Sequence, residues 1–93
     1  MDNKQLYIYP AIASKSGSNY GVYFPNFPGC IATGATLDET LYLAKEGLPM
    51  HIWGMEQGGE PLPAPSPIDE IPLKSGEVLC LLDANVENIR KTA

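Results

Sequence analysis

The sequence predicts an α+β fold, in which an antiparallel three-stranded meander and a fourth strand form a sheet with one main helix packed on it, in the order β-β-β-α-β. Three observations support this prediction. Short extended segments with turn signals between them fill the first 35 residues, a capped amphipathic helix follows, and an apolar run comes after a proline-rich segment. Residues 1–84 are assigned to this domain, and residues 85–93 to a polar C-terminal tail.

The N-terminal third is predicted to form three strands. Residues 5–13 are rich in Tyr and Ile, and Pro10, which has no N–H to donate, favours an edge strand or a strand that bends. A short polar connection leads to a strand at residues 20–24, where apolar side chains alternate with others. A corner with two more prolines and a glycine ends it, and residues 30–35 complete the meander.

A single long helix is predicted next. Thr36, followed three residues later by Glu39, forms a capping box at its start. Pro49 removes one hydrogen bond of the helix, so the helix is expected to bend or restart at residues 45–49. Two glycines after residue 57 end it. The stripe expected to cover the sheet consists of Leu37, Leu41, Ala44, Leu48, Ile52 and Met55.

The segment after the helix is predicted to be a strap across the surface. Residues 60–67 contain four prolines, which favour an extended, polyproline-like path. Three apolar residues are expected to hold the strap against the body: Ile68, Ile71 and Leu73. Residues 77–84 are apolar enough to form a strand that shares the same core.

Composition excludes several classes of function. The net charge of −5 opposes binding to nucleic acid phosphates and favours a basic partner. No stretch is long and apolar enough for a membrane span, and the N-terminus does not read as a secretory signal, so a cytoplasmic protein is the default. One His and two distant Cys do not make a metal site, and no cofactor is indicated. Cys30 and Cys80 could pair, but two buried free thiols are expected.

Several short motifs, in this order and spacing, resemble the N-terminal domain of HicB-type antitoxins. The match covers nearly the whole chain and is carried by YPA at residues 9–11, YGVYFPNFPGC at 20–30, TGATLDE at 33–39, AKE at 44–46 and GEPLPAPS at 59–66. This copy departs from the family pattern at Asn26, where Asp is common, at Gly47 and Pro49 in the helix, and at Trp53, where an acidic residue is common.

The resemblance implies a partial ribonuclease-H-like arrangement and a non-enzymatic antitoxin of a type II toxin–antitoxin system. Such a domain would bind a small basic HicA-type ribonuclease that cleaves mRNA and cover its catalytic histidine. Family members commonly continue into a DNA-binding and dimerising segment. Either the domain is a solitary one, or the tail at residues 85–93 is the start of that segment; no DNA binding is assigned to the residues of this chain in either case.

The predicted partner-binding residues lie on the helix. Tyr42, Glu46, Pro49, Trp53 and Glu56 fall on one helical face, roughly opposite the core stripe. Trp53 is interpreted either as an interface anchor or as a side chain that packs on the strap prolines. The residues expected to contact the toxin are Glu39, Tyr42, Glu46, Trp53 and Glu56.

Two other hypotheses compete with the antitoxin. A metal-dependent nuclease needs converging carboxylates, but Asp38 and Glu39 open the helix, where its dipole favours acids, and Asp83 alone lies in a predicted strand. The second hypothesis is a stand-alone homo-oligomeric structural or regulatory module without a toxin. A homo-oligomer is also expected on general grounds, because the first strand, as an edge, could pair with another copy.

Overall fold

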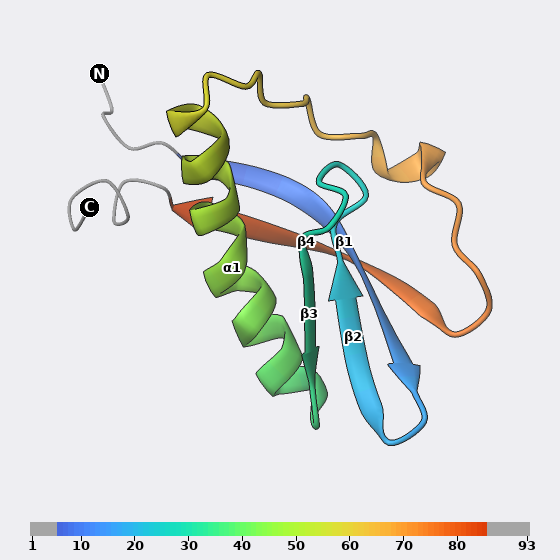
Figure 1. Ribbon diagram of the computed structural model, residues 1–93. Coiled ribbons are helices and arrows are strands. Elements are labelled where there is room, and N and C mark those ends of the chain that lie inside the picture. The colour runs from blue at the N-terminus through green and yellow to red at the C-terminus, as the bar shows by residue number, and fades with distance from the viewer. Residues whose placement is uncertain (1–5, 86–93) are drawn as a thin grey trace.

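The computed structural model describes residues 6–85, which form a four-stranded antiparallel sheet and one long helix (Figure 1). The elements in chain order are β1 (Leu6–Ser16), β2 (Asn19–Tyr23), β3 (Ile31–Gly34), α1 (Leu37–Gln57), the 3-10 turn η1 (Ile68–Glu70) and β4 (Glu77–Asn85). The predicted fold class and element order are confirmed. Apart from Asn85 at the end of β4, the predicted tail lies outside the described residues.

β1 is a central strand, so the prediction that it lies at an edge is wrong. The strand order is β3-β2-β1-β4, with β1 antiparallel to both of its neighbours. β1 pairs with β4 from Leu6 to Ser14 but with β2 only from Ile12 onward. Pro10 therefore lies in the part of β1 that pairs with one strand alone, which is how the sheet tolerates its missing donor. The edge strands are β3 and β4, and β1 lacks a strand partner on one side only over residues 6–11.

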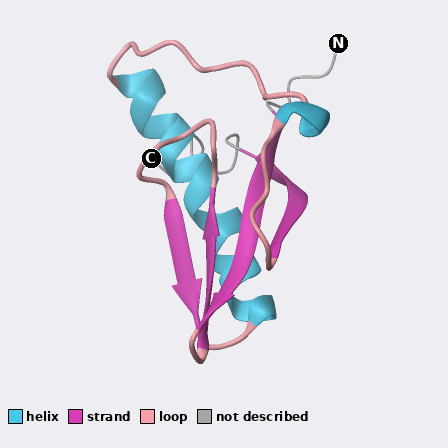
Figure 2. Ribbon diagram, turned by 90° about the vertical axis from the view of Figure 1, so that its right-hand side faces the viewer, coloured by secondary structure: helices cyan, strands magenta, loops and turns pink. Residues whose placement is uncertain are grey.

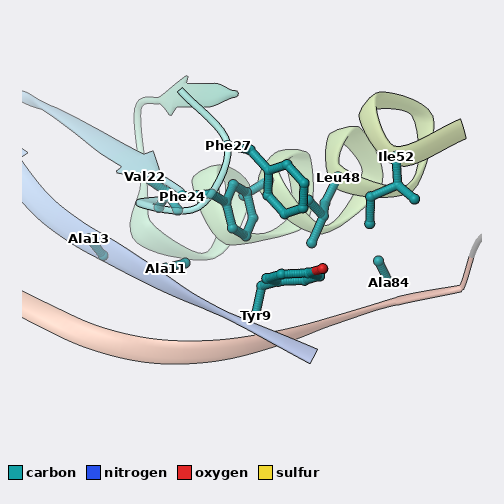
Figure 3. Packing of buried hydrophobic residues seen from close by; sticks show 10 residues of the cluster. Tyr9, Ala11, Ala13, Val22, Phe24, Phe27, Leu48, Ile52 and Ala84 are labelled. Atoms are coloured by element: carbon teal, nitrogen blue, oxygen red, sulfur yellow. The ribbon is translucent and has the colours of Figure 1, made fainter. Parts of the chain in front are cut away.

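The hydrophobic core lies between one face of the sheet and α1, which crosses that face (Figures 1 and 2). Alternate residues of β1, namely Tyr9, Ala11 and Ala13, point toward the helix and are buried. Opposite them lie Leu48 and Ile52 of α1, both with 0% exposure (Figure 3). Phe24 and Phe27 of the corner after β2 lie in the middle of this core, where Phe27 contacts Tyr9 (Figure 3). Small alanines in β1 leave room for the larger helix side chains.

Both ends of α1 follow the predicted capping chemistry. The hydroxyl of Thr36 accepts a hydrogen bond from the Glu39 N–H at 3.1 Å, and the Glu39 carboxylate accepts one from the Ala35 N–H at 2.9 Å. At the other end Gly59 has φ of 72°, a left-handed conformation that costs glycine little. Its N–H donates to the Glu56 carbonyl while that of Glu60 donates to Met55, which is the Schellman pattern.

α1 continues through Pro49 as one helix, so the predicted restart does not occur. Of the predicted stripe, Ala44, Leu48 and Ile52 are buried and two more members are half-buried. Leu37 is an exception, because it is exposed at the first turn of the helix. Thr40 is buried on this side of the helix instead. Its hydroxyl donates a hydrogen bond to the Thr36 carbonyl at 2.7 Å, so the buried polar group has a partner.

The strap runs from the end of α1 to η1 and is fixed by hydrogen bonds to its carbonyl and amide groups (Figure 1). The Tyr9 hydroxyl donates to the Pro63 carbonyl at 2.6 Å. The Asn26 amide nitrogen donates to the Ala64 carbonyl at 3.2 Å and to the Ser66 hydroxyl at 3.0 Å, while its oxygen accepts from the Ser66 N–H at 3.2 Å. Asn26 therefore uses both ends of its amide to fasten the strap to the corner after β2.

The three apolar residues predicted to hold the strap against the body are buried less than expected. Ile68 and Leu73 are exposed, and Ile71 is half-buried. Leu62 is the strap residue that packs against the core. The strap is therefore held mainly over residues 62–66, just before η1. The short turn η1 was not predicted.

We expect Tyr9→Phe to lower the free energy of unfolding by about 1 kcal/mol at neutral pH, because the Pro63 carbonyl loses its donor. Burial, and secondarily the neighbouring Tyr7, raise the pKa of Tyr9 above its usual value of 10.0. The unfolded chain then loses this proton first, so the wild type should lose stability as the pH rises beyond about 10. Phe has no such proton, so denaturant unfolding from pH 7 to pH 11 should show the two stabilities converging. Tyr42→Phe, on an exposed ring, is the control, and parallel curves for Tyr9→Phe and wild type would contradict the expectation.

We expect Asn26→Asp to destabilise the protein by about 1–2 kcal/mol, because a carboxylate oxygen replaces the donor that faces the Ala64 carbonyl. Urea unfolding at neutral pH measures the loss. Asn19→Asp makes the same chemical change at an exposed position and should have little effect. Equal losses in the two variants would show that the strap hydrogen bonds do not contribute.

Candidate partner-binding surface

The side of α1 turned away from the sheet carries two of the predicted partner-binding residues together. Tyr42 and Glu46 are one helical turn apart, so their side chains are neighbours on the helix surface. Tyr42 is 64% exposed, and Glu46 is also exposed. An exposed aromatic ring beside a carboxylate can contact both apolar and basic groups of another molecule.

Glu39 has a structural role in the same helix. Its N–H and its carboxylate both belong to the N-terminal cap, with the Thr36 hydroxyl and the Ala35 N–H as partners. The residue is nevertheless exposed. A carboxylate has further acceptor sites when one is occupied, so Glu39 can also face a cation at the first turn.

Trp53 and Glu56 do not lie on a fully exposed face as predicted. Both are half-buried, Trp53 packs against the hydrophobic core, and Pro49 on the same face is buried. The buried side of α1 turns along its length, from Thr40 and Ala44 near the start to a set that includes Pro49 near the end. Trp53 therefore packs within the chain, against the core, while its packing on the strap prolines stays a prediction.

Two exposed apolar residues of the outward side were missed in the sequence. Leu43 is 42% exposed and Met50 is 62% exposed. Helical spacing places both on the same side as Tyr42 and Glu46. The available signal was that Leu43 and Met50 are apolar but lie off the predicted core stripe. We call Tyr42, Leu43, Glu46 and Met50 the α1 outer surface.

The charge of α1 is predominantly negative. The helix contains Asp38, Glu39, Glu46 and Glu56 against one cation, Lys45. Lys45 is itself engaged, because its Nζ lies 3.2 Å from a carboxylate oxygen of Asp83 in β4. The α1 outer surface therefore presents apolar side chains in an acidic setting, which favours a partner with both apolar and basic groups.

A hollow of about 230 Å³ lies beside the first turn of α1, on the helix side of the sheet. Leu37 and Leu41 of the helix line it together with side chains from the end of β1 and the start of β4. Its lining is almost entirely apolar, and the exposed Leu37 forms part of it. The hollow can receive an apolar side chain.

The chemistry of the remaining candidate groups agrees with structural roles. Cys30 and Cys80 are free and half-buried, and burial raises the pKa of each thiol above its usual value of 9.0, which disfavours the nucleophilic thiolate at neutral pH. His51 is half-buried and makes an edge contact with Phe27, with ring centroids 5.5 Å apart. Among residues 6–85, no three His, Cys, Asp or Glu side chains are grouped so as to hold a metal ion. In the same residues, no helix combines the length and apolar character needed to cross a membrane.

Comparison with curated proteins finds a relative in a bacteriophage. It is described as an uncharacterized 14.9 kDa protein in the rep-hol intergenic region of Haemophilus phage HP1 (strain HP1c1). The two are 40% identical over 63 residues, which cover 68% of this chain and 47% of the relative. The matched segment therefore spans about half the length of this relative.

Comparison with solved structures finds the same fold in antitoxins. The fold matches a toxin–antitoxin complex from Streptococcus pneumoniae with a TM-score of 0.79 at 20% identity, over 91% of this chain and 73% of that one. The HicA3 and HicB3 toxin–antitoxin complex matches with a TM-score of 0.65 at 30% identity, over 82% and 95%. The N-terminal domain of Burkholderia pseudomallei antitoxin HicB matches with a TM-score of 0.67 at 26% identity, over 82% and 95%.

Comparison with protein-family models gives the assignment. Residues 9–93 match the model of the HicB-like antitoxin of bacterial toxin–antitoxin systems, which covers almost the whole chain. The four-stranded sheet with one packed helix agrees with that match. The chain therefore belongs to the HicB-like antitoxin family.

Proposed function

We propose that this chain is the partner-binding domain of an antitoxin that binds a small basic HicA-type ribonuclease and masks its active site. The observation that carries the proposal is the family match over residues 9–93. Two of the similar solved structures are toxin–antitoxin complexes, which supports a toxin as the partner of this chain as well. Because the toxin would act on mRNA, we place the complex in the cytoplasm.

The proposal assigns toxin contact to Glu39, Tyr42, Glu46, Trp53 and Glu56, and the α1 outer surface adds Leu43 and Met50. Tyr42 and Met50, at 64% and 62% exposure, offer the largest accessible apolar area of this set. Aromatic and Met side chains of this kind are enriched in the centres of protein interfaces. Trp53 would contribute the part of its ring that remains accessible, since the rest packs on the core.

Charge supports the same surface. The chain carries a net charge of −5, and α1 has an excess of carboxylates. Complementary charge accelerates the encounter of two proteins and orients them, while buried apolar contacts supply most of the affinity. In this proposal the antitoxin inhibits the toxin sterically. It performs no chemical step and excludes RNA by lying over the active site of the toxin.

Growth rescue tests the proposed function directly. The gene neighbouring this one should encode a small basic protein whose expression stops growth, and co-expression of this chain should restore growth. Affinity pull-down from the same cells should recover the two proteins together. If the neighbour is toxic and this chain neither binds it nor restores growth, the proposal fails for these residues.

Glu46→Lys tests the contact surface. Reversal of this exposed charge should slow association with the toxin by about tenfold at low salt and by less at high salt, because screening removes the electrostatic attraction. Glu70→Lys makes the same charge reversal at an exposed position in η1 and is the matched control. Surface plasmon resonance at two ionic strengths gives both rates. Equal effects of the two variants would place toxin contact elsewhere.

A further inference from the structure

The hollow beside the first turn of α1 has apolar walls on two sides and a charged wall on a third. The apolar walls include Leu37 and Leu41 of the helix and Val78 of β4. Lys15 and Tyr20, which are directly opposite each other in β1 and β2, form the wall at the β1–β2 hairpin. The hairpin and the start of α1 lie at the same end of the domain (Figure 1). A molecule in the hollow would therefore meet apolar side chains and one cation.

The hollow has the size of a small organic ligand. Its volume is about 230 Å³, whereas a dry apolar cavity of about 150 Å³ holds one benzene ring. A single aromatic ring with a short polar substituent therefore fits. Leu37 and Val78 are 41% and 63% exposed, so the hollow opens to solvent and a ligand can enter it without any change in the fold.

Lys15, the only charged residue that lines the hollow, has no ion-pair partner within the described chain. Among residues 6–85 the one ion pair joins Lys45 and Asp83. The Nζ of Lys15 lies over the ring of Tyr20 instead, 5.8 Å from its centroid. Such a cation–π contact positions an ammonium group without neutralising its charge. The hollow therefore carries a net positive group at its hairpin side.

Two carboxylates at the same end of the domain make contacts of their own with backbone donors. The Glu39 carboxylate accepts from the Ala35 N–H, and that of Glu77 accepts from the Lys74 N–H at 2.7 Å. Glu77 also lies opposite Ser14, whose side chain alternates with that of Lys15 and so points to the other face of the sheet. A carboxylate from outside the chain would supply the missing counter-charge, whereas a basic side chain would be repelled.

We propose that the hollow binds a small monocarboxylate with an apolar body, such as an arylacetate. Its ring would lie between Leu37, Leu41 and Val78, and its carboxylate would meet the Lys15 ammonium. The net charge of −5 opposes anions over most of the surface, so this local cation gives the site its preference for an acid. The proposal adds a ligand site to the antitoxin domain and does not depend on toxin binding.

Phenylacetate and its neutral analogue phenylacetamide are suitable probes. In NMR titrations of the wild type at about 0.15 M salt, phenylacetate should give saturable shifts of the methyl groups of Leu37, Leu41 and Val78. A dissociation constant on the order of 1 mM is expected for a ligand of about ten non-hydrogen atoms, and phenylacetamide should bind at least about threefold more weakly.

Three results of these titrations would overturn the proposal. The first is the absence of saturable shifts up to about 20 mM ligand, well above the expected dissociation constant. The second is equal affinity for the acid and the amide, or shifts centred on another surface. The third is a shift of the same methyl groups when the concentration of the chain alone is raised, which would assign the hollow to a second copy.

Two pairs of variants separate the charge from the apolar walls. Lys15→Met should weaken phenylacetate about threefold and leave phenylacetamide unchanged, whereas Lys74→Met, at an exposed residue outside the lining, should affect neither. Leu37→Ala should weaken both ligands, whereas Leu43→Ala, at 42% exposure against 41%, should affect neither. Equal effects within either pair would contradict the proposal, and thermal unfolding confirms that each variant is folded.

Discussion

The contacts of Tyr9 connect the parts of this domain. Its ring lies in the core against Phe27, with centroids 4.6 Å apart in an edge arrangement, and extends from β1 toward Leu48 of the helix (Figure 3). Its hydroxyl leaves the core at the other end to bond the Pro63 carbonyl. One side chain therefore packs between sheet and helix, contacts the corner after β2 through Phe27 and holds the strap at Pro63. A tyrosine suits this place because its body is apolar and its tip is polar.

Local patterns of the sequence were sufficient for the order of elements and for the ends of the helix. Thr36 with Glu39, and the glycines after Gln57, act through their immediate neighbours, so the sequence specifies them directly. The position of β1 in the sheet is different, because it depends on pairing with β4 at the far end of the chain. Pro10 correctly indicated that β1 lacks a strand partner on one side, but this holds only for residues 6–11 and not for the whole strand.

The exposure of the candidate site residues was predictable only in the part of α1 where the buried side follows the predicted core stripe. Tyr42 and Glu46 are exposed as expected. Trp53 departs from the expectation because the buried side of α1 turns as the helix crosses the sheet, a consequence of packing that an ideal helical projection lacks. Leu43 and Met50 were overlooked for a related reason: apolar residues outside the main stripe were not considered as surface.

The staggered pairing of β1 also bears on how the chain folds. Residues 6–11 of β1 have β4 as their strand partner, and β4 is the last described element, whereas the rest of β1 can pair with β2 immediately. During synthesis on the ribosome, half of β1 must therefore wait for nearly the entire domain to emerge. Contacts between such distant segments form slowly because a large loop must close first. Completion of the sheet by β4 is then the step that converts a partly ordered nascent chain into a finished domain.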